Sequence, residues 1–100
     1  MTEKNQREKE LYEQKMRARL DEWKAELDKL KARARGASAD TQLEMNRRIE
    51  NLETAIQEGE TRLSALSEAG DDAWESIREG VDAAWESLTS AFDQTSRYEE

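Results

Sequence analysis

The sequence predicts an all-α protein, a coiled coil or helical bundle formed by one domain of residues 1–100. Three observations lead to this prediction. Ala, Glu, Lys, Leu and Arg together supply 55 of the 100 residues, a bias typical of long helices. Proline is absent, so no proline ring interrupts a helix. The sparse large apolar residues recur at intervals of three and four, which is the spacing of one helix face.

One apolar stripe runs along most of the chain. From Tyr12 to Phe92, 22 steps of three or four residues cover 80 residues, a mean of about 3.64 residues per step. This period predicts nearly straight helices or a weak right-handed twist, and it does not fit a leucine zipper. We expect the helix interface to consist of these residues of the stripe: Met16, Leu20, Trp23, Leu27, Leu30, Met45, Ile49, Leu52, Ile56, Leu63, Leu66, Trp74, Ile77, Val81, Trp85, Leu88 and Phe92.

The first expected element is a long amphipathic helix over residues 5–68. Its main support is that the stripe keeps its phase where large apolar residues are missing, passing through Ser38 and Thr41. A flexible loop has no reason to preserve helical phase, so the pattern favours a continuous helix.

The alternative is a helical hairpin that turns at residues 36–40, which would give three helices. Gly36 is suited to end one helix, and Ser38 or Asp40 is suited to cap the next. The other interpretation of this segment is ordinary helix with small side chains, which agrees with the unbroken stripe.

The second expected element is a C-terminal helix over residues 71–95, after a bend near Gly70. A glycine followed by two aspartates fits a stop and a restart, because Gly suits a C-terminal cap and Asp suits the first turn of a helix. Within this helix, Ala-Trp-Glu-Ser at residues 73–76 recurs at residues 84–87. An offset of 11 residues returns to the same face after three turns, which is typical of a flat amphipathic helix.

Charge is distributed unevenly along the chain. Residues 1–35 carry a net charge of +3, residues 36–69 carry −4 and residues 70–100 carry −7. This gradient favours antiparallel pairing of the basic first part with the acidic last part, within one chain or between chains.

The composition excludes several functions. There is no His and no Cys, so the commonest general base, the commonest transition-metal ligand and any thiol chemistry are missing. We therefore expect no enzyme activity, no catalytic residues, no metal, no cofactor and no small-molecule substrate. The net charge of −8 disfavours nucleic-acid binding. No apolar run is long enough for a membrane span and the N-terminus is polar, so we expect a cytoplasmic protein.

A narrow stripe on a helix must be buried against another helix, another chain or an apolar surface. The stripe and the charge gradient favour a structural or interaction protein that self-associates as a homo-oligomer. The alternative is reversible binding to a lipid or other apolar surface, for which an 11-residue period is suited. The residues that would make this contact are Trp74, Ile77, Val81, Trp85, Leu88 and Phe92.

The chain also resembles a family of small bacterial coiled-coil proteins of about 100 residues. The resemblance is carried by Leu-Asp-Glu-Trp-Lys-Ala-Glu-Leu at residues 20–27, Ala-Ser-Ala-Asp at residues 37–40 and the paired Ala-Trp-Glu-Ser repeats. Some cyanobacterial members are described as stress-response proteins, so the resemblance implies a helical bacterial protein with a stress association. It implies no catalytic residues. Gly36 stands where the family pattern leads us to expect a charged residue, which favours a break in the helix there.

Overall fold

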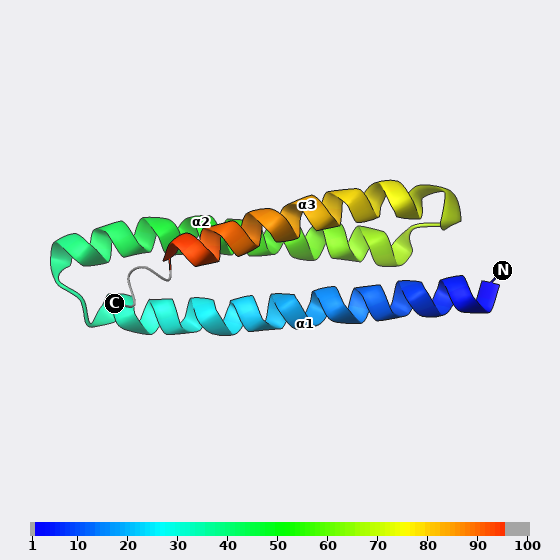
Figure 1. Ribbon diagram of the computed structural model, residues 1–100. Coiled ribbons are helices and arrows are strands. Elements are labelled where there is room, and N and C mark those ends of the chain that lie inside the picture. Colours follow the sequence, from blue (N-terminus) through cyan, green and yellow to red (C-terminus); the bar gives the residue numbers. More distant parts are fainter. Residues whose placement is uncertain (1, 96–100) are drawn as a thin grey trace.

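The protein is an elongated bundle of three α-helices, seen here in a computed structural model that measures 57 × 17 × 17 Å (Figure 1). The structure describes residues 2–95, and the side chains of residues 6–94. Helix α1 spans Thr2–Arg35, α2 spans Ala39–Glu68 and α3 spans Asp71–Thr95. The all-α prediction is confirmed, and the C-terminal helix has the bounds that the sequence predicted.

The predicted continuous helix over residues 5–68 is wrong for this structure, because the chain turns back between Arg35 and Ala39. The alternative hairpin with three helices is the fold that the structure shows. A straight helix would leave its stripe without a partner inside one chain, whereas a hairpin buries both halves against each other. Gly36 lowers the penalty for ending the helix, because Gly is about 1 kcal/mol less favourable than Ala in a helix interior.

Ser38 occupies the N-cap position of α2, with φ −61° and ψ 161°. Its carbonyl oxygen accepts the first helical hydrogen bond from the Gln42 N–H at 2.8 Å. Its hydroxyl makes no cap hydrogen bond and instead donates to the Thr41 hydroxyl at 3.1 Å. The N-cap is therefore defined by backbone conformation, and the side chain adds little to it.

The second connection consists of Ala69 and Gly70. The Gly70 carbonyl accepts hydrogen bonds from the N–H groups of Ala73 at 3.1 Å and Trp74 at 3.0 Å. Gly70 thus directly precedes α3 and accepts its first helical hydrogen bond, whereas the sequence suggested that it would end the preceding helix. Ala69 takes that C-cap role. Asp71 and Asp72 lie in the first turn of α3, as expected for acids at a helix N-terminus.

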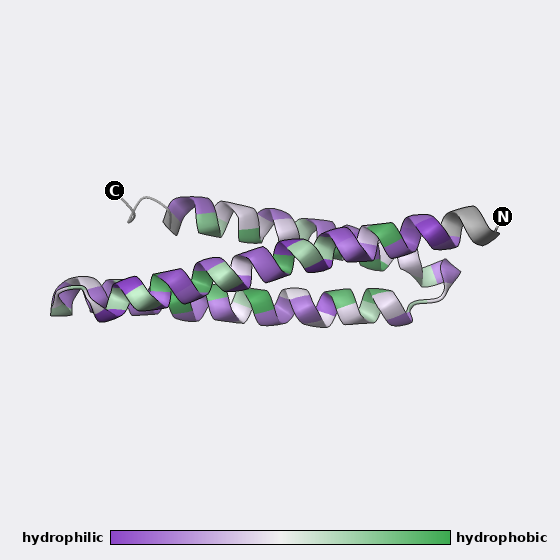
Figure 2. Cartoon of the chain, turned by 90° about the horizontal axis from the view of Figure 1, so that it is seen from below, coloured by the Kyte–Doolittle hydropathy of each residue, from purple (hydrophilic) through white to green (hydrophobic). Residues whose placement is uncertain are grey.

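The core lies along the long axis, between the three helices. Figure 2 shows green hydrophobic residues recurring at intervals along the helices, among purple hydrophilic and pale residues. The largest fully buried side chains are Leu63 and Leu66 on α2 and Val81 and Leu88 on α3. The hairpin formed by α1 and α2 extends beyond the C-terminal end of α3, so the bundle has three helices along most of its length and two at the hairpin end (Figure 1).

Basic and acidic helices pair within the chain. Lys24 of α1 pairs with Glu60 at 3.1 Å, and Lys31 pairs with Glu53 at 3.2 Å, across the antiparallel α1–α2 contact. Lys9 pairs with Asp71 of α3. Within this chain, the expected antiparallel pairing of the first part with the last part is wrong in its direction. Two short connections return the chain twice, so α1 and α3 run parallel (Figure 1).

Across the described part of the chain, no helix combines the length and the apolarity that crossing a membrane requires.

Candidate functional site

The seam between α1 and α3 is held by side chains more than by close backbone packing. Helix α2 packs along both of its neighbours, whereas the backbones of α1 and α3 approach each other at few points. Aromatic side chains bridge this wider seam: Tyr12 meets Trp74 edge to face at 5.6 Å, Trp23 meets Trp85 at 5.9 Å and Trp23 stacks on Phe92 at 6.0 Å. These separations lie in the range at which aromatic pairs attract each other.

The two indole N–H groups of α3 differ in their hydrogen bonding. Trp85 Nε1 donates to the Met16 carbonyl of α1 at 3.3 Å, which ties the middle of the seam together. Trp74 Nε1 is buried, and it has no hydrogen-bond partner among the residues that the structure describes. A buried donor without a partner costs about 1–3 kcal/mol, a cost that the hydrogen-bonded Trp85 indole does not carry.

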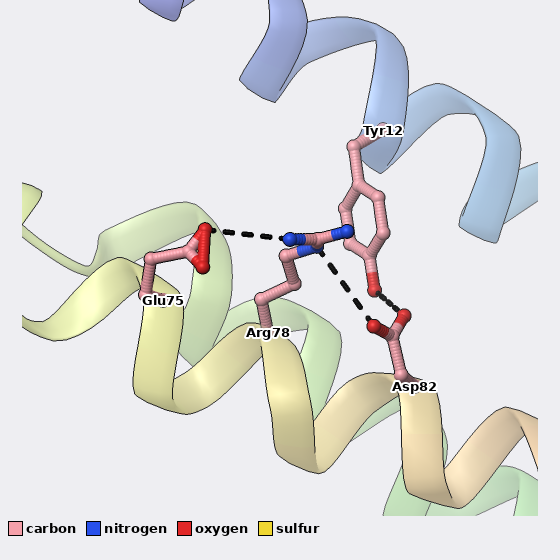
Figure 3. Close-up of polar contacts among 4 residues, drawn as sticks. All are labelled: Tyr12, Glu75, Arg78 and Asp82. Carbon is pink, nitrogen blue, oxygen red and sulfur yellow. Dashed lines mark hydrogen bonds and ion pairs between the residues drawn. The ribbon is translucent and has the colours of Figure 1, made fainter.

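A polar network joins α1 to α3 (Figure 3), and its Tyr12 ring is the one that meets Trp74. The Tyr12 hydroxyl donates to the Asp82 carboxylate. The Arg78 guanidinium lies over the Tyr12 ring at 5.4 Å and pairs with Glu75 at 3.3 Å and with Asp82 at 3.8 Å. Arg78 therefore contacts two carboxylates and one phenol ring.

The environment changes the titration of two groups in this network. Burial raises the pKa of the Tyr12 phenol well above its ordinary value, and the hydrogen bond to Asp82 and the charge of Asp82 raise it further. Desolvation lowers the pKa of Arg78, but Asp82 and Glu75 outweigh it and the pKa of Arg78 rises. The phenol stays protonated at neutral pH, so Tyr12 acts as a hydrogen-bond donor and not as a base.

Lys9 forms a second link between the helices. Its ammonium group lies 5.5 Å from the centroid of the Trp74 ring and pairs with Asp71 in the first turn of α3. The hydrogen bond and the charge of Lys9 lower the pKa of Asp71 below its ordinary value. The Asp71 side chain is 88% exposed, so solvent screens this ion pair and its contribution is small.

Two hollows open along the seam. One, of about 470 Å³, is lined by Glu8, Lys9, Tyr12, Asp71, Trp74, Glu75 and Arg78. The other, of about 640 Å³, is lined by Lys15, Met16, Arg19, Asp82, Trp85, Glu86, Thr89 and Ser90. In the first hollow, Lys9 pairs with Asp71 across the seam, and Arg78 pairs with Glu75 within α3, so both basic groups already have acidic partners on this chain. Nowhere in the described part do three His, Cys, Asp or Glu side chains come together in a way that would hold a metal ion.

The expected interface residues meet in one cluster. All of them are buried except Ile77 and Phe92, which are partly buried and pack against the cluster. The six residues considered for surface binding on α3 thus face the inside of the bundle. Ala34 and Gly59 complete the buried set, and both also lie on the stripe.

Sequence reasoning missed the polar network, because Tyr12 and Asp82 are 70 positions apart. One signal was present: Arg78 is the single basic residue of α3, with acids three positions before it and four positions after it.

The fold and the seam together define a three-helix bundle with an aromatic and charged contact between its first and last helices. Comparison with protein-family models, with curated proteins and with solved structures finds no match to this chain.

Proposed function

We propose that this chain is a non-enzymatic structural or interaction protein that works by helix–helix contact and associates with copies of itself. The observation that carries the proposal is that a single stripe, shared by all three helices, forms the whole buried cluster. Each helix therefore finds its complementary partner on the same chain. A second copy offers the same complementary surfaces, which is the basis of self-association in symmetric oligomers.

The charges of the helices support the same proposal. Helix α1, which belongs to the basic segment, pairs with the acidic helices α2 and α3 through Lys9, Lys24 and Lys31. Helices α2 and α3 are both acidic and pack on each other through apolar side chains, so the favourable charge partner of either is the basic α1 of its own chain or of another copy. The resemblance described above extends the proposal to a stress-associated role in a bacterium.

The chemistry of the seam supports a role without catalysis. Its phenol is held in the protonated form, and Lys9 and Arg78 are engaged with carboxylates of the same chain. A catalytic base or nucleophile needs a group that titrates near the working pH or is activated by a neighbouring base. The seam offers donors and ion pairs suited to holding helices together.

The test is light scattering after size exclusion, combined with far-ultraviolet circular dichroism, over a hundredfold range of protein concentration. We expect high helicity at every concentration, because the stripe is buried within one chain, and a mass that rises from monomer to oligomer. A mass that stays monomeric throughout would contradict self-association. Low helicity at all concentrations would contradict the closed bundle.

A second candidate function is reversible binding of α3 to an apolar surface. It is favoured by the 11-residue repeat, which places Trp74 and Trp85 on one face of α3. That face is buried, so binding requires α3 to leave the bundle. Because α3 is acidic, we expect flotation with neutral vesicles or oil droplets and none with anionic vesicles. Failure to float with either neutral surface would count against this candidate.

A further inference from the structure

We propose that α1 is exchanged between two copies of this chain. The hinge at residues 36–38 opens, and α1 of each copy packs onto α2 and α3 of the other copy. The inference rests on the self-association proposed above and assigns it a surface, namely the face of α2 and α3 that α1 of the same chain covers in the monomer.

The hinge contains little that would hold the chain closed. Neither Gly36 nor any other glycine in the described chain has a positive φ, and a Cβ at Gly36 would meet only the Arg33 carbonyl, at an ordinary 3.8 Å. The turn is closed by hydrogen bonds from the Gly36 and Ala37 N–H groups, at 3.1 and 3.2 Å, to carbonyls three positions earlier. When the hinge residues become helical in the open chain, these bonds are replaced by bonds to carbonyls four positions earlier. Opening therefore loses few backbone hydrogen bonds.

The phase of the stripe across the hinge suits an open chain. Between Ala34 and Met45 the stripe steps through Ser38 and Thr41 at helical spacing. A hairpin does not require this, because each of its helices is oriented by its own packing. In an open chain with a helical hinge, the same phase places the apolar faces of α1 and α2 on one side. A second open chain can then cover both faces at once.

An antiparallel pair of open chains restores the contacts of the closed hairpin. In the hairpin, α1 lies antiparallel to α2, and contacting residues lie at similar distances from the turn. In the exchanged dimer, α1 lies antiparallel to α2 of the other copy, at the same distances from the two hinges. The pairs Lys24–Glu60 and Lys31–Glu53 can therefore form between copies as they form within one. Charge selects this arrangement, because α2 and α3 are acidic and α1 belongs to the basic segment.

A second copy is needed to stabilise the open state. Leu20, Trp23, Leu27 and Leu30 of α1 are buried in the monomer, with 3–6% of each side chain exposed. Opening exposes these side chains to water until another copy covers them. Exchange of identical elements between copies is a common route to dimers when a hinge can extend, because it requires no new interface.

The experiment follows the native Lys24–Glu60 pair in a mixture of chains with natural and heavy nitrogen isotopes. The chains are unfolded together and refolded at high concentration, and monomer and dimer are separated. A carbodiimide then joins lysines to neighbouring carboxylates without a spacer, and mass spectrometry reads the isotope of each linked peptide. We expect mixed-isotope Lys24–Glu60 links in the dimer, in the statistical proportion, and only same-isotope links in the monomer.

The outcomes separate this inference from the proposed function. A dimer whose Lys24–Glu60 links are all of one isotope would overturn the exchange and leave self-association through another surface. A protein that never forms a dimer would overturn both. Mixed links in the dimer support the exchange.

Two hinge variants test the opening itself. Gly36→Ala leaves the closed turn unchanged but favours a helical hinge in both chains, so we expect the dimer dissociation constant to fall about thirtyfold. Ser38→Pro fits the closed turn, where Ser38 has φ −61°, but disfavours a helix interior, so we expect the constant to rise at least a hundredfold. Ser38→Ala, which removes the hydroxyl but does not restrict φ, is the control. A dissociation constant that does not respond to Ser38→Pro would overturn opening at this hinge.

Discussion

At the residue scale, the glycines of the chain have different roles. Gly59 lies on the stripe, and a Cβ there would approach the Trp85 ring at 3.2 and 3.3 Å and the Leu88 side chain at 3.5 Å. Gly80 lies in the middle of α3, and a Cβ there would meet only the tip of the Arg62 side chain, at 3.1 Å. Gly59 therefore makes room for an aromatic ring, whereas Gly80 makes room for a flexible group that can move away.

This difference predicts opposite effects of substitution. We expect Gly59→Leu to lower the free energy of unfolding by about 1–3 kcal/mol, because the added side chain must displace Trp85 in a packed core. We expect Gly80→Ala to raise it by about 1 kcal/mol, because Arg62 can swing away and Ala is the better helix former. Urea denaturation of both variants measures the two changes. Stabilisation by Gly59→Leu would contradict the close contact with Trp85.

The Tyr12 phenol links stability to alkaline pH. Its pKa is raised in the folded chain, so above the ordinary tyrosine pKa of about 10 the unfolded chain loses this proton more readily and the bundle loses stability. We expect the phenolate absorbance of a Tyr98→Phe variant, in which Tyr12 is the sole tyrosine, to appear above pH 10. Asp82→Asn removes the neighbouring charge and should lower the pKa of Tyr12.

The control for this titration is Tyr12→Phe. The loss of stability assigned to Tyr12 is the part of the alkaline loss that disappears in this variant. Equal alkaline loss in the parent and in Tyr12→Phe would show that the phenol does not contribute.

At the element scale, the two connections determine how the helices stack. Each reverses the chain within two or three residues, which is short enough to place neighbouring helices antiparallel. The Ser38 hydroxyl makes no cap hydrogen bond to α2, and Gly70 has no side chain with which to cap α3. The helix starts are therefore places where stability can be added.

Gly70 is the clearest such place. It has no positive φ, and a Cβ there would meet nothing within 4 Å. We expect Gly70→Ser to raise the free energy of unfolding by about 0.5–1 kcal/mol, because serine restricts the unfolded chain and its hydroxyl caps the first turn of α3. Thermal unfolding followed by circular dichroism measures the change, with Gly70→Ala separating the entropic part from the cap. A loss of stability in both variants would show that the turn requires glycine.

At the scale of the whole molecule, the bundle has an apolar interior and scattered apolar residues outside. Trp85 is 5% exposed and donates a hydrogen bond to the Met16 carbonyl, whereas Leu43 on α2 is 65% exposed. The sequence left Trp85 and the rest of the stripe to be covered by another helix, another chain or an apolar surface, and in this structure the other helices of the same chain cover them. A charge placed at Trp85 reports on folding, and a charge placed at Leu43 reports on the outer surface.

The paired variants Trp85→Glu and Leu43→Glu separate these two effects. We expect Trp85→Glu to lower the free energy of unfolding by about 3–5 kcal/mol or more, because it removes a large core side chain and buries a charge. We expect Leu43→Glu to change it by no more than about 0.5 kcal/mol. If the exchange of α1 accounts for self-association, the oligomer mass of Leu43→Glu equals that of the parent. Loss of oligomers in Leu43→Glu would instead place the contact on the outer face of α2.

The sequence by itself determined the helical class, the members of the core and the bounds of α3. These properties depend on neighbours three and four positions away, so periodicity, composition and the Gly-Asp-Asp start are enough to reveal them. Tertiary structure alone decided that the chain turns at residues 36–38, that α1 lies parallel to α3, and that Tyr12 meets Asp82. The stripe phase is the same in a straight helix and in a hairpin, so only burial against the rest of the chain distinguishes the two forms.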